Sequence, residues 1–262
     1  MITITSKDNQ IIKEVSSLRE KKYRDKLGLY LIEGPNLVKE LMDFGGRPRF
    51  IFIKVGANDE VRNIVSNADE TSTVYELTED VFGKISDTLN PQGIVAVADK
   101  TEYSVNTFFN SVMDGNVLVL DRLQDPGNVG TLIRLSEAMG FKGVIFIKGS
   151  ADPYQPKVVR AAAGAILRVP MLFLDSAEEC IELLNRYNKK IYAAFMDADK
   201  VVSEADLKKN VAIIIGNEGS GISKDFEKKS EKLMIPMSGK TESLNAAIAG
   251  TIIMYESKRQ RL

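Results

Sequence analysis

Three apolar runs in this sequence carry valine, isoleucine or leucine at half or more of their positions. They are NVLVLD at residues 116–121, GVIFIK at 143–148 and VAIIIG at 211–216. A strand with one exposed face alternates apolar and polar residues, whereas an unbroken apolar run is typical of a strand buried on both faces. Segments with helical spacing separate the runs. The pattern therefore predicts an α/β fold in which helices flank a parallel sheet.

The first hundred residues alternate in the same way, with shorter elements. Residues 7–26 have the apolar spacing of a helix, and GLYLIEG, RFIFIKV, TVYEL and GIVAVAD are predicted strands separated by further helices. Residues 101–115 (TEYSVNTFFNSVMDG) break this rhythm. We therefore predict a smaller α/β domain at residues 1–100, a linker at 101–115 and a larger parallel-sheet domain at 116–262.

The chain has no histidine and a single cysteine, Cys180. This composition excludes a Ser-His-Asp triad, a Cys-His pair, a histidine-ligated zinc ion and a thiolate metal cluster, and we expect no metal site. Proton transfer would have to use carboxylates, lysine, tyrosine, water or the substrate itself. Cys180 lies at an apolar position of a predicted helix and is interpreted as a buried thiol.

Composition also predicts where the protein works. A single cysteine fits a reducing compartment. No apolar run approaches the roughly 20 residues that a membrane span needs. The first ten residues, MITITSKDNQ, lack the basic-then-apolar order of a signal peptide. We expect a cytoplasmic protein that does not contact a membrane.

The formal net charge of −1 argues against a uniformly basic surface but permits a local patch. One basic segment lies within the predicted helix at residues 7–26. It is interpreted either as a solvated helix end or as a patch that contacts the phosphates of a nucleic acid. Its cations are Arg19, Lys21, Lys22, Arg24 and Lys26.

Three polar loops each follow a predicted strand. In the first, LDRLQDPGNVGTLIR, Asn128 is placed to cap a helix and Arg134 follows one to two turns later. A helix N-terminus with an arginine can bind an anion, phosphate above all. The alternative is a capping asparagine and an ordinary surface arginine. The loop has too few glycines for the G-x-G-x-x-G dinucleotide motif, and no P-loop is present.

The other two loops lie in the last fifty residues. GNEGSG at residues 216–221 places Glu218 among glycines that permit close approach of a ligand. MSGKTESLN at residues 237–245 places Ser243 and Asn245 at the start of a helix, where either side chain could simply be a cap. Ligands of open α/β sheets bind at the carboxyl ends of the strands, which is where these loops begin.

Together the loops resemble the motifs of the SpoU (TrmH-type) family of SPOUT RNA 2′-O-ribose methyltransferases. The family's motifs have the forms N-x-G-x-x-x-R, G-x-E-x-x-G and I-P-M-x-G…S-L-N. The matching residues are Asn128-Val-Gly130…Arg134, Gly216-Asn-Glu218-Gly-Ser-Gly221 and Ile235-Pro-Met237-Ser-Gly239…Ser243-Leu244-Asn245. Residues 1–99 also resemble the family's accessory substrate-binding domain, which has a ribosomal-protein-like fold that binds RNA. The resemblance therefore covers nearly the whole chain.

The resemblance implies that the protein methylates a ribose 2′-hydroxyl of RNA with S-adenosylmethionine as donor. It also implies a homodimer whose active site lies close to the subunit interface. In such proteins the C-terminal segment is threaded through a loop as a trefoil knot, a feature that apolar periodicity does not predict. On this basis the basic segment is interpreted as an RNA contact.

Roles for individual residues follow from the same resemblance. The positions that form the catalytic cluster of the family are Asn128, Arg134, Glu218 and Asn245. The positions that hold S-adenosylmethionine are Gly216, Ile235 and Leu244 through their backbone, with Asn217 and Met237 as neighbours of the cofactor.

Arg134 is expected to hold the phosphate beside the target ribose. A guanidinium keeps its proton at neutral pH, so it is a poor base. The hydroxyl proton would pass to that phosphate or to water. Glu218 would orient Arg134 or the ribose, while Asn128 and Asn245 would fix the loops.

The chain departs from the family's pattern at Ala247, where S-L-N-V-S is common and a hydroxyl is expected. A similar loss occurs in RAAAGA at residues 160–165, where relatives often carry a serine. We interpret both as tuning of the substrate. The alternative is an RNA-binding protein that has lost catalysis.

The two-domain layout resembles the ribosomal RNA members of the family, so large-subunit (23S) ribosomal RNA is the expected substrate. A transfer-RNA 2′-O-methyltransferase, an antibiotic-resistance ribosomal RNA methyltransferase and an unrelated α/β enzyme that uses another nucleotide remain alternatives. The sequence does not identify the methylated nucleotide.

Overall fold

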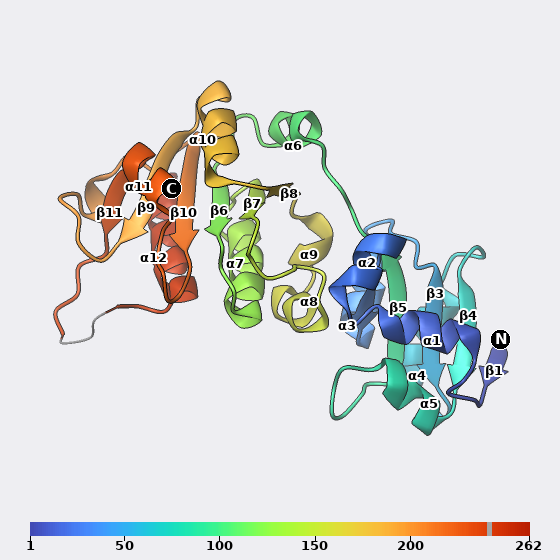
Figure 1. The fold of residues 1–262 in the computed structure, drawn as a ribbon. Helices are drawn as coiled ribbons and strands as arrows, with labels where there is room; N and C mark the ends of the chain where they lie inside the picture. Colours follow the sequence, from blue (N-terminus) through green and yellow to red (C-terminus); the bar gives the residue numbers. More distant parts are fainter. Residues whose placement is uncertain (240–242) are drawn as a thin grey trace. The chain divides into compact units, whose positions relative to one another are not determined.

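The computed structural model describes residues 1–239 and 243–262 and divides into two compact units (Figure 1). Unit 1 contains residues 1–100 and 152–167, and unit 2 contains residues 101–151 and 168–262. The chain therefore leaves unit 1 after residue 100, returns to it at residue 152 and leaves again after residue 167. Among the described residues no helix is both long and apolar enough to cross a membrane.

Unit 1 is built on a five-stranded mixed sheet in the order β1-β4-β3-β5-β2. Strands β1, β4 and β3 are parallel, whereas β5 pairs antiparallel with both β3 and β2. The strands are β1 (Ile2–Ile4), β2 (Leu29–Glu33), β3 (Phe50–Lys54), β4 (Thr73–Leu77) and β5 (Ile94–Asp99). The helices of residues 1–100 are α1 (Gln10–Ser17), α2 (Lys21–Leu27), α3 (Pro35–Asp43), α4 (Asp59–Ser66) and α5 (Glu79–Ile85).

The single helix expected at residues 7–26 is instead two helices, α1 and α2. Helix α1 begins at its cap Asn9, whose side chain accepts a hydrogen bond from the amide of Ile11. It ends at Leu18, and Glu20 has extended backbone angles before α2 begins. The break is stable because Arg24 donates hydrogen bonds to the carbonyls of Leu18 and Arg19, which the end of α1 leaves without helical partners.

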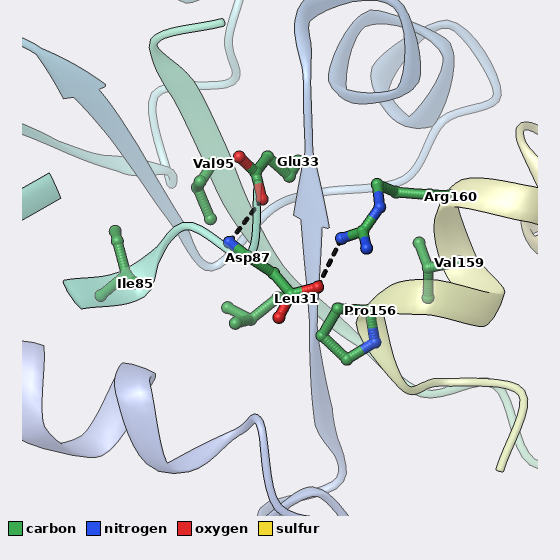
Figure 2. A pocket seen from close by; sticks show the side chains of 8 residues that line it. All are labelled: Leu31, Glu33, Ile85, Asp87, Val95, Pro156, Val159 and Arg160. Atoms are coloured by element: carbon green, nitrogen blue, oxygen red, sulfur yellow. Dashed lines mark hydrogen bonds and ion pairs between the residues drawn. The ribbon is translucent and has the colours of Figure 1, made fainter. Parts of the chain in front are cut away.

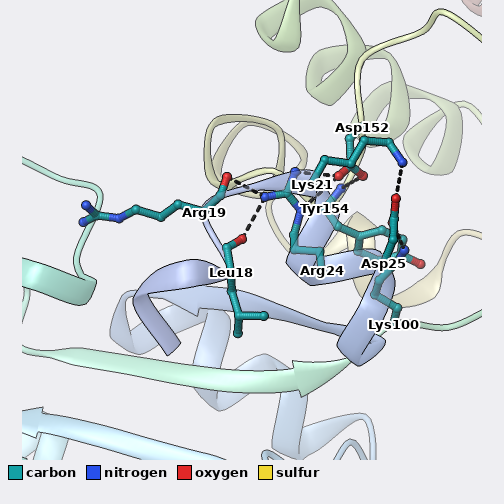
Figure 3. Close-up of polar contacts among 8 residues, drawn as sticks. All are labelled: Leu18, Arg19, Lys21, Arg24, Asp25, Lys100, Asp152 and Tyr154. Atoms are coloured by element: carbon teal, nitrogen blue, oxygen red, sulfur yellow. Dashed lines mark hydrogen bonds and ion pairs between the residues drawn. The ribbon is translucent and has the colours of Figure 1, made fainter. Parts of the chain in front are cut away.

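Arg24 is also one half of a buried ion pair (Figure 3). Its Nε and Nη2 atoms lie 2.9 and 2.6 Å from Oδ2 of Asp152, and the side chains are only 3% and 8% exposed. Next to this pair, the rings of Tyr30 and Tyr154 pack with centroids 4.9 Å apart. A buried charge is tolerated only with such compensation. These contacts attach the segment that begins at residue 152 to unit 1.

Helix α8 (Pro156–Ala162) completes the attachment by packing against β2. Figure 2 shows Arg160 of α8 turned toward Asp87, and their Nη1 and Oδ2 atoms lie 2.6 Å apart. Asp87 is fixed in turn because its amide donates to Glu33. Residues 152–167 pack with the N-terminal residues, although the sequence assigns them to the parallel-sheet domain.

The predicted parallel sheet is present in unit 2, with six strands in the order β11-β9-β10-β6-β7-β8. Every neighbouring pair is parallel. The strands are β6 (Val117–Asp121), β7 (Gly143–Ile147), β8 (Met171–Leu174), β9 (Lys190–Phe195), β10 (Val211–Gly216) and β11 (Glu231–Met234). The helical segments are α6 (Val105–Ser111), α7 (Pro126–Ala138), α10 (Ala177–Arg186), η1 (Val202–Glu204), α11 (Lys224–Lys229) and α12 (Ala246–Arg259), and α9 (Ala165–Arg168) lies where the chain leaves unit 1.

The segment expected as a linker, residues 101–115, is part of the core of unit 2. Phe108 and Phe109 of α6 are fully buried against the central strands. The turn after α6 is fastened by Lys189, whose Nζ donates to the carbonyls of Val112, Met113 and Gly115 at 2.7–2.9 Å. Burial lowers the pKa of Lys189 to about 8. Two adjacent phenylalanines are a core signal, which the polar residues around them obscure.

Helix α12 packs on α7 and β10. The approach is close at Gly250, where a Cβ atom would lie 2.6 Å from Cδ2 of Leu132. All strands of this sheet run the same way, so the loops that follow β6, β9, β10 and β11 meet at one edge. The N-termini of α7 and α12 stand at these loops.

We predict that Arg24→Ala lowers the free energy of unfolding of unit 1 by about 3–5 kcal/mol, because it leaves the Asp152 carboxylate buried without its partner. Urea unfolding followed by circular dichroism and by hydrogen exchange in unit 1 measures this. The matched control is Arg49→Ala, which breaks the exposed Arg49–Asp99 pair and should cost about 1 kcal/mol or less. Equal losses for the two variants would contradict the structural role of Arg24.

Candidate active site

A pocket of about 690 Å³ opens at the carboxyl edge of the parallel sheet. Its walls come from the ends of β9, β10 and β11 and from the first turn of α12. Apolar side chains make much of the wall, among them Phe195, Ile215 and Leu233. All five residues predicted to hold the cofactor line it: Gly216, Asn217, Ile235, Met237 and Leu244. Residues 240–242 of the third loop lie outside the described residues.

Three of the four predicted catalytic residues form one hydrogen-bonded cluster beside this pocket. Nδ2 of Asn128 donates to Oε1 of Glu218 at 3.0 Å. Nδ2 of Asn245 donates to Oδ1 of Asn128, also at 3.0 Å. Glu218 and Asn245 line the pocket themselves. The cluster therefore joins loops that are 117 residues apart in the chain.

Glu218 is held by the backbone as well as by Asn128. Its carboxylate accepts hydrogen bonds from the amides of Gln124 and Asp125, each at 3.1 Å. Partial burial raises the pKa of Glu218, but the hydrogen bonds from Asn128 and from backbone amides outweigh it and leave the pKa below its ordinary value. Glu218 is therefore ionised at neutral pH.

The loop that carries Glu218 is a tight turn at residues 217–221. The backbones of Asn217 and Gly221 exchange two hydrogen bonds of 3.1 and 3.0 Å. Oδ1 of Asn217 accepts the amides of Gly219 and Ser220. Because the chain folds back over Gly216, a Cβ atom there would lie 2.6 Å from the backbone of residues 221 and 222. Gly216 is thus required by the fold of the loop.

Arg134 does not join the cluster. It is exposed on α7 and forms no hydrogen bond or ion pair within the described part of the chain. It follows Asn128 by six residues, about 9 Å along the helix at about 1.5 Å per residue. The expectation that Glu218 orients Arg134 has no contact to support it, because the donors to Glu218 are Asn128 and backbone amides.

The caps of the two helices differ in part from expectation. Asp125, not Asn128, caps α7, with its Oδ1 atom 2.8 Å from the amide of Asn128. This leaves the Asn128 side chain free to meet Glu218 and Asn245. Asn245 caps α12 and accepts hydrogen bonds from the amides of Ala247 and Ile248. Ala247 is buried at 4% exposure, so its missing hydroxyl concerns the packing of the first turn.

Asp121 and Arg122 were not predicted from the sequence, yet their hydrogen bonds hold the Glu218 loop in place. The carboxylate of Asp121 is fully buried at the end of β6 and accepts the amide of Ser223 at 2.6 Å and Nε of Arg122 at 3.0 Å. The signal that could have identified Asp121 is its place as a charged residue at the end of an otherwise apolar strand. The wall contributed by Ala194 and Phe195 of β9 carried no comparable signal.

The five cations of the basic segment have different surroundings in the structure. Arg24 is buried in its pair with Asp152, so its predicted contact with RNA is wrong. Arg19 donates to the carbonyl of Ser86, and Lys21 pairs with Asp25. Lys22 and Lys26 are exposed and form no ion pair with a described residue. In the described ranges no group of side chains suited to hold a metal ion is found.

Comparisons with known proteins cover both units. Residues 115–255 match the SpoU rRNA Methylase family, and residues 9–96 match the MRM3-like substrate binding domain. The 23S rRNA (guanosine(2553)-2′-O)-methyltransferase RlmP of Bacillus subtilis is 33% identical over 256 residues, which are 97% of this chain and 98% of that protein.

Solved structures agree over the whole length. An AdoMet-bound rRNA methyltransferase from Sinorhizobium meliloti has a TM-score of 0.89 at 27% identity and covers 99% of this chain and 98% of its own. A putative RNA methyltransferase of the TrmH family from Porphyromonas gingivalis has a TM-score of 0.82 at 35% identity, with 95% and 97% covered. This chain belongs to the SpoU rRNA methylase family.

Proposed function

We propose that this protein transfers a methyl group from S-adenosylmethionine to a ribose 2′-hydroxyl of RNA, and that large-subunit ribosomal RNA is its substrate. The observation that carries the proposal is the hydrogen-bonded cluster of Asn128, Glu218 and Asn245, of which Glu218 and Asn245 line the pocket. The Bacillus subtilis relative is named for methylation of a 23S rRNA guanosine, which supports the substrate. We place this activity in the cytoplasm.

The pocket suits S-adenosylmethionine in size and lining. Its volume of about 690 Å³ falls within the roughly 300–1,000 Å³ common for ligand sites. Ile215, Ile235 and Leu244 offer apolar contacts for a purine, and the turn at residues 217–221 offers backbone groups for polar atoms. When bound, the cofactor supplies a methyl group on a positively charged sulfur.

The residues around the pocket then position the ribose. Glu218 and the two asparagines are fixed by one another, so they hold the loops without rearrangement during the reaction. Arg134 binds the phosphate beside the target ribose and stabilises the oxygen as negative charge develops on it. The hydroxyl proton passes to that phosphate or to water. Positioning of this kind supplies several kcal/mol, so a strong base is not needed.

We predict that Arg134→Ala abolishes methylation while the affinity for S-adenosylmethionine stays within about threefold, because the phosphate contact is lost and the pocket is not. Calorimetry measures cofactor affinity, and transfer of labelled methyl groups to ribosomal RNA measures activity. An RNA with a 2′-deoxy target nucleotide should accept no methyl group from the wild type. Normal turnover by Arg134→Ala would refute its role, and methylation of the deoxy RNA would refute the 2′-hydroxyl as acceptor.

Lys22 and Lys26 are proposed as RNA contacts of unit 1. Both lie on α2, whose position is fixed by the buried pair of Arg24 and Asp152. Lysines that are free of intramolecular ion pairs can neutralise phosphates without first breaking a bond. Arg19 and Lys21 already have partners within the chain and contribute less to this surface.

We predict that the double charge reversal Lys22→Glu/Lys26→Glu weakens RNA binding and lowers the slope of log K against log salt by about one to two units, because phosphate contacts release counterions. Binding titrations at several salt concentrations measure both effects. Lys39→Glu/Arg62→Glu, on α3 and α4 of the same unit, makes the same change in charge and should leave the slope unchanged. Identical slopes for the two double variants would show that α2 is only a solvated helix.

We further propose a homodimer that uses one face of α12. Ile248 and Tyr255 are 51% and 55% exposed and lie seven residues apart, on one side of that helix. The helix begins at Asn245, so an interface along this face would lie beside the catalytic cluster. A second copy could then bring its Arg134 toward the cluster that Arg134 of the same chain does not contact.

We predict that Ile248→Asp/Tyr255→Asp converts a dimer into monomers and reduces methylation. The dimer should dissociate because burial of a carboxylate in an apolar interface is unfavourable. Sedimentation equilibrium measures the mass, with Met113→Asp as control because Met113 is an exposed apolar residue outside α12. A wild type of about 29 kDa in solution would rule out the dimer.

The trefoil knot is also proposed for this chain. Asn116 immediately precedes β6, and its Nδ2 atom donates to the carbonyl of Leu207 and to the hydroxyl of Ser257 in α12. These hydrogen bonds and the packing of α12 on α7 and β10 support the proposal that the C-terminal segment is threaded through a loop. A crystal structure traced through residues 200–262 would decide whether the segment is threaded.

A further inference from the structure

Asp121 is a fully buried carboxylate whose hydrogen bonds all go to groups that shape the Glu218 loop. It accepts Nε of Arg122 at 3.0 Å, Nη2 of Arg122 at 3.3 Å and the amide of Ser223 at 2.6 Å. A buried carboxylate is tolerated only when such donors are present. Three donors converge on it, two of them from one guanidinium. An asparagine at this position would turn an NH₂ group toward one of those donors.

Arg122 connects Asp121 to the turn at residues 217–221. Its Nη2 donates to the carbonyl of Gly221 at 3.2 Å, and its own carbonyl accepts Nδ2 of Asn217 at 2.8 Å. One arginine therefore binds both ends of the turn at residues 217–221. With the bond from Ser223 to Asp121, the loop is tied to β6 on either side of Glu218.

The backbone of Arg122 is held in an unfavourable conformation to make these contacts. Its φ is +58°, a left-handed value that is costly for a residue with a Cβ atom. The neighbouring loop after β7 makes room for it, because a Cβ atom on Gly149 would lie 3.3 Å from Cγ of Arg122. Such strain persists only where surrounding contacts over-determine it, and it is concentrated at functional sites.

We propose that Asp121 and Arg122 are a positioning pair for the reaction. They hold residues 217–223 so that Glu218 reaches Asn128 and the turn keeps the shape of the pocket wall. Neither residue is among the described residues that line the pocket. This inference rests on the proposed use of the pocket for S-adenosylmethionine, and it assigns the pair a role in cofactor affinity and in the rate of transfer.

Asp121→Asn and Arg122→Ala test the pair, with Asp175→Asn as the matched control. The control breaks the exposed Lys148–Asp175 pair beyond the ends of the neighbouring strands β7 and β8 and should change nothing. Amide hydrogen exchange of residues 217–223 should become about tenfold faster in both test variants, and cofactor binding about tenfold weaker. Misplacement of Glu218 should lower kcat about 10- to 100-fold while KM for RNA stays within about threefold.

Arg122→Lys separates positioning from folding. Lysine keeps the charge near Asp121 but cannot bridge Asp121 and Gly221 with a planar fork, so it should recover part of kcat and none of the slow exchange at Gly221. Should Asp121→Asn fail to fold, Arg122→Ala carries the test, because its side chain is 36% exposed. Exchange and cofactor affinity within about twofold of the wild type in Arg122→Ala would overturn the proposal.

Failure of the positioning role of Asp121 and Arg122 can be distinguished from failure of the proposed function. Exchange of residues 217–223 and calorimetry with S-adenosylmethionine need no RNA and no methyl transfer. If the wild type binds the cofactor and transfers nothing to RNA, the proposed function fails while the effect of the pair on the loop still stands. If the wild type does not bind S-adenosylmethionine, the cofactor part of the inference fails with it.

Discussion

A charged group that lies wholly inside a protein must find hydrogen-bonding partners, and this requirement organises both units. In unit 2 the buried carboxylate of Asp121 draws Arg122 and the amide of Ser223 to the end of β6. The turn that carries Glu218 is fixed as a result. The Glu218 carboxylate then accepts hydrogen bonds from Asn128 and from the backbone at the start of α7. A pocket wall and a polar cluster therefore depend on one carboxylate that touches neither.

The same requirement acts in unit 1 through Arg24. Its guanidinium satisfies two carbonyls at the break between α1 and α2 and the carboxylate of Asp152. Asp152 comes from a segment that follows β7 of the other unit in the chain, so the ion pair draws that segment and α8 into unit 1. A basic residue that resembles an RNA contact in the sequence is thus a structural one, whereas Lys22 and Lys26 of the same helix are exposed.

Much of the fold and of the site is predictable from the sequence. The unbroken apolar runs correctly indicate a parallel sheet, and the glycine-rich loops correctly mark its carboxyl edge as the pocket. What could not be predicted are pairings between distant residues. The break in the first helix depends on Arg24, and the role of Asp125 as the cap of α7 depends on Asn128 being used elsewhere. The burial of Phe108 and Phe109 depends on strands that follow them in the chain.

The sequence by itself determined the parallel sheet, the family and part of the lining of the pocket, because these follow from local apolar periodicity and from short motifs. Only the tertiary structure decided which charges are buried, which unit residues 152–167 belong to, and that Asn128, Glu218 and Asn245 meet while Arg134 stands apart. The physical reason is that burial and hydrogen bonding are properties of contacts between residues roughly 90 to 130 positions apart, and no local pattern specifies which donor will find which acceptor.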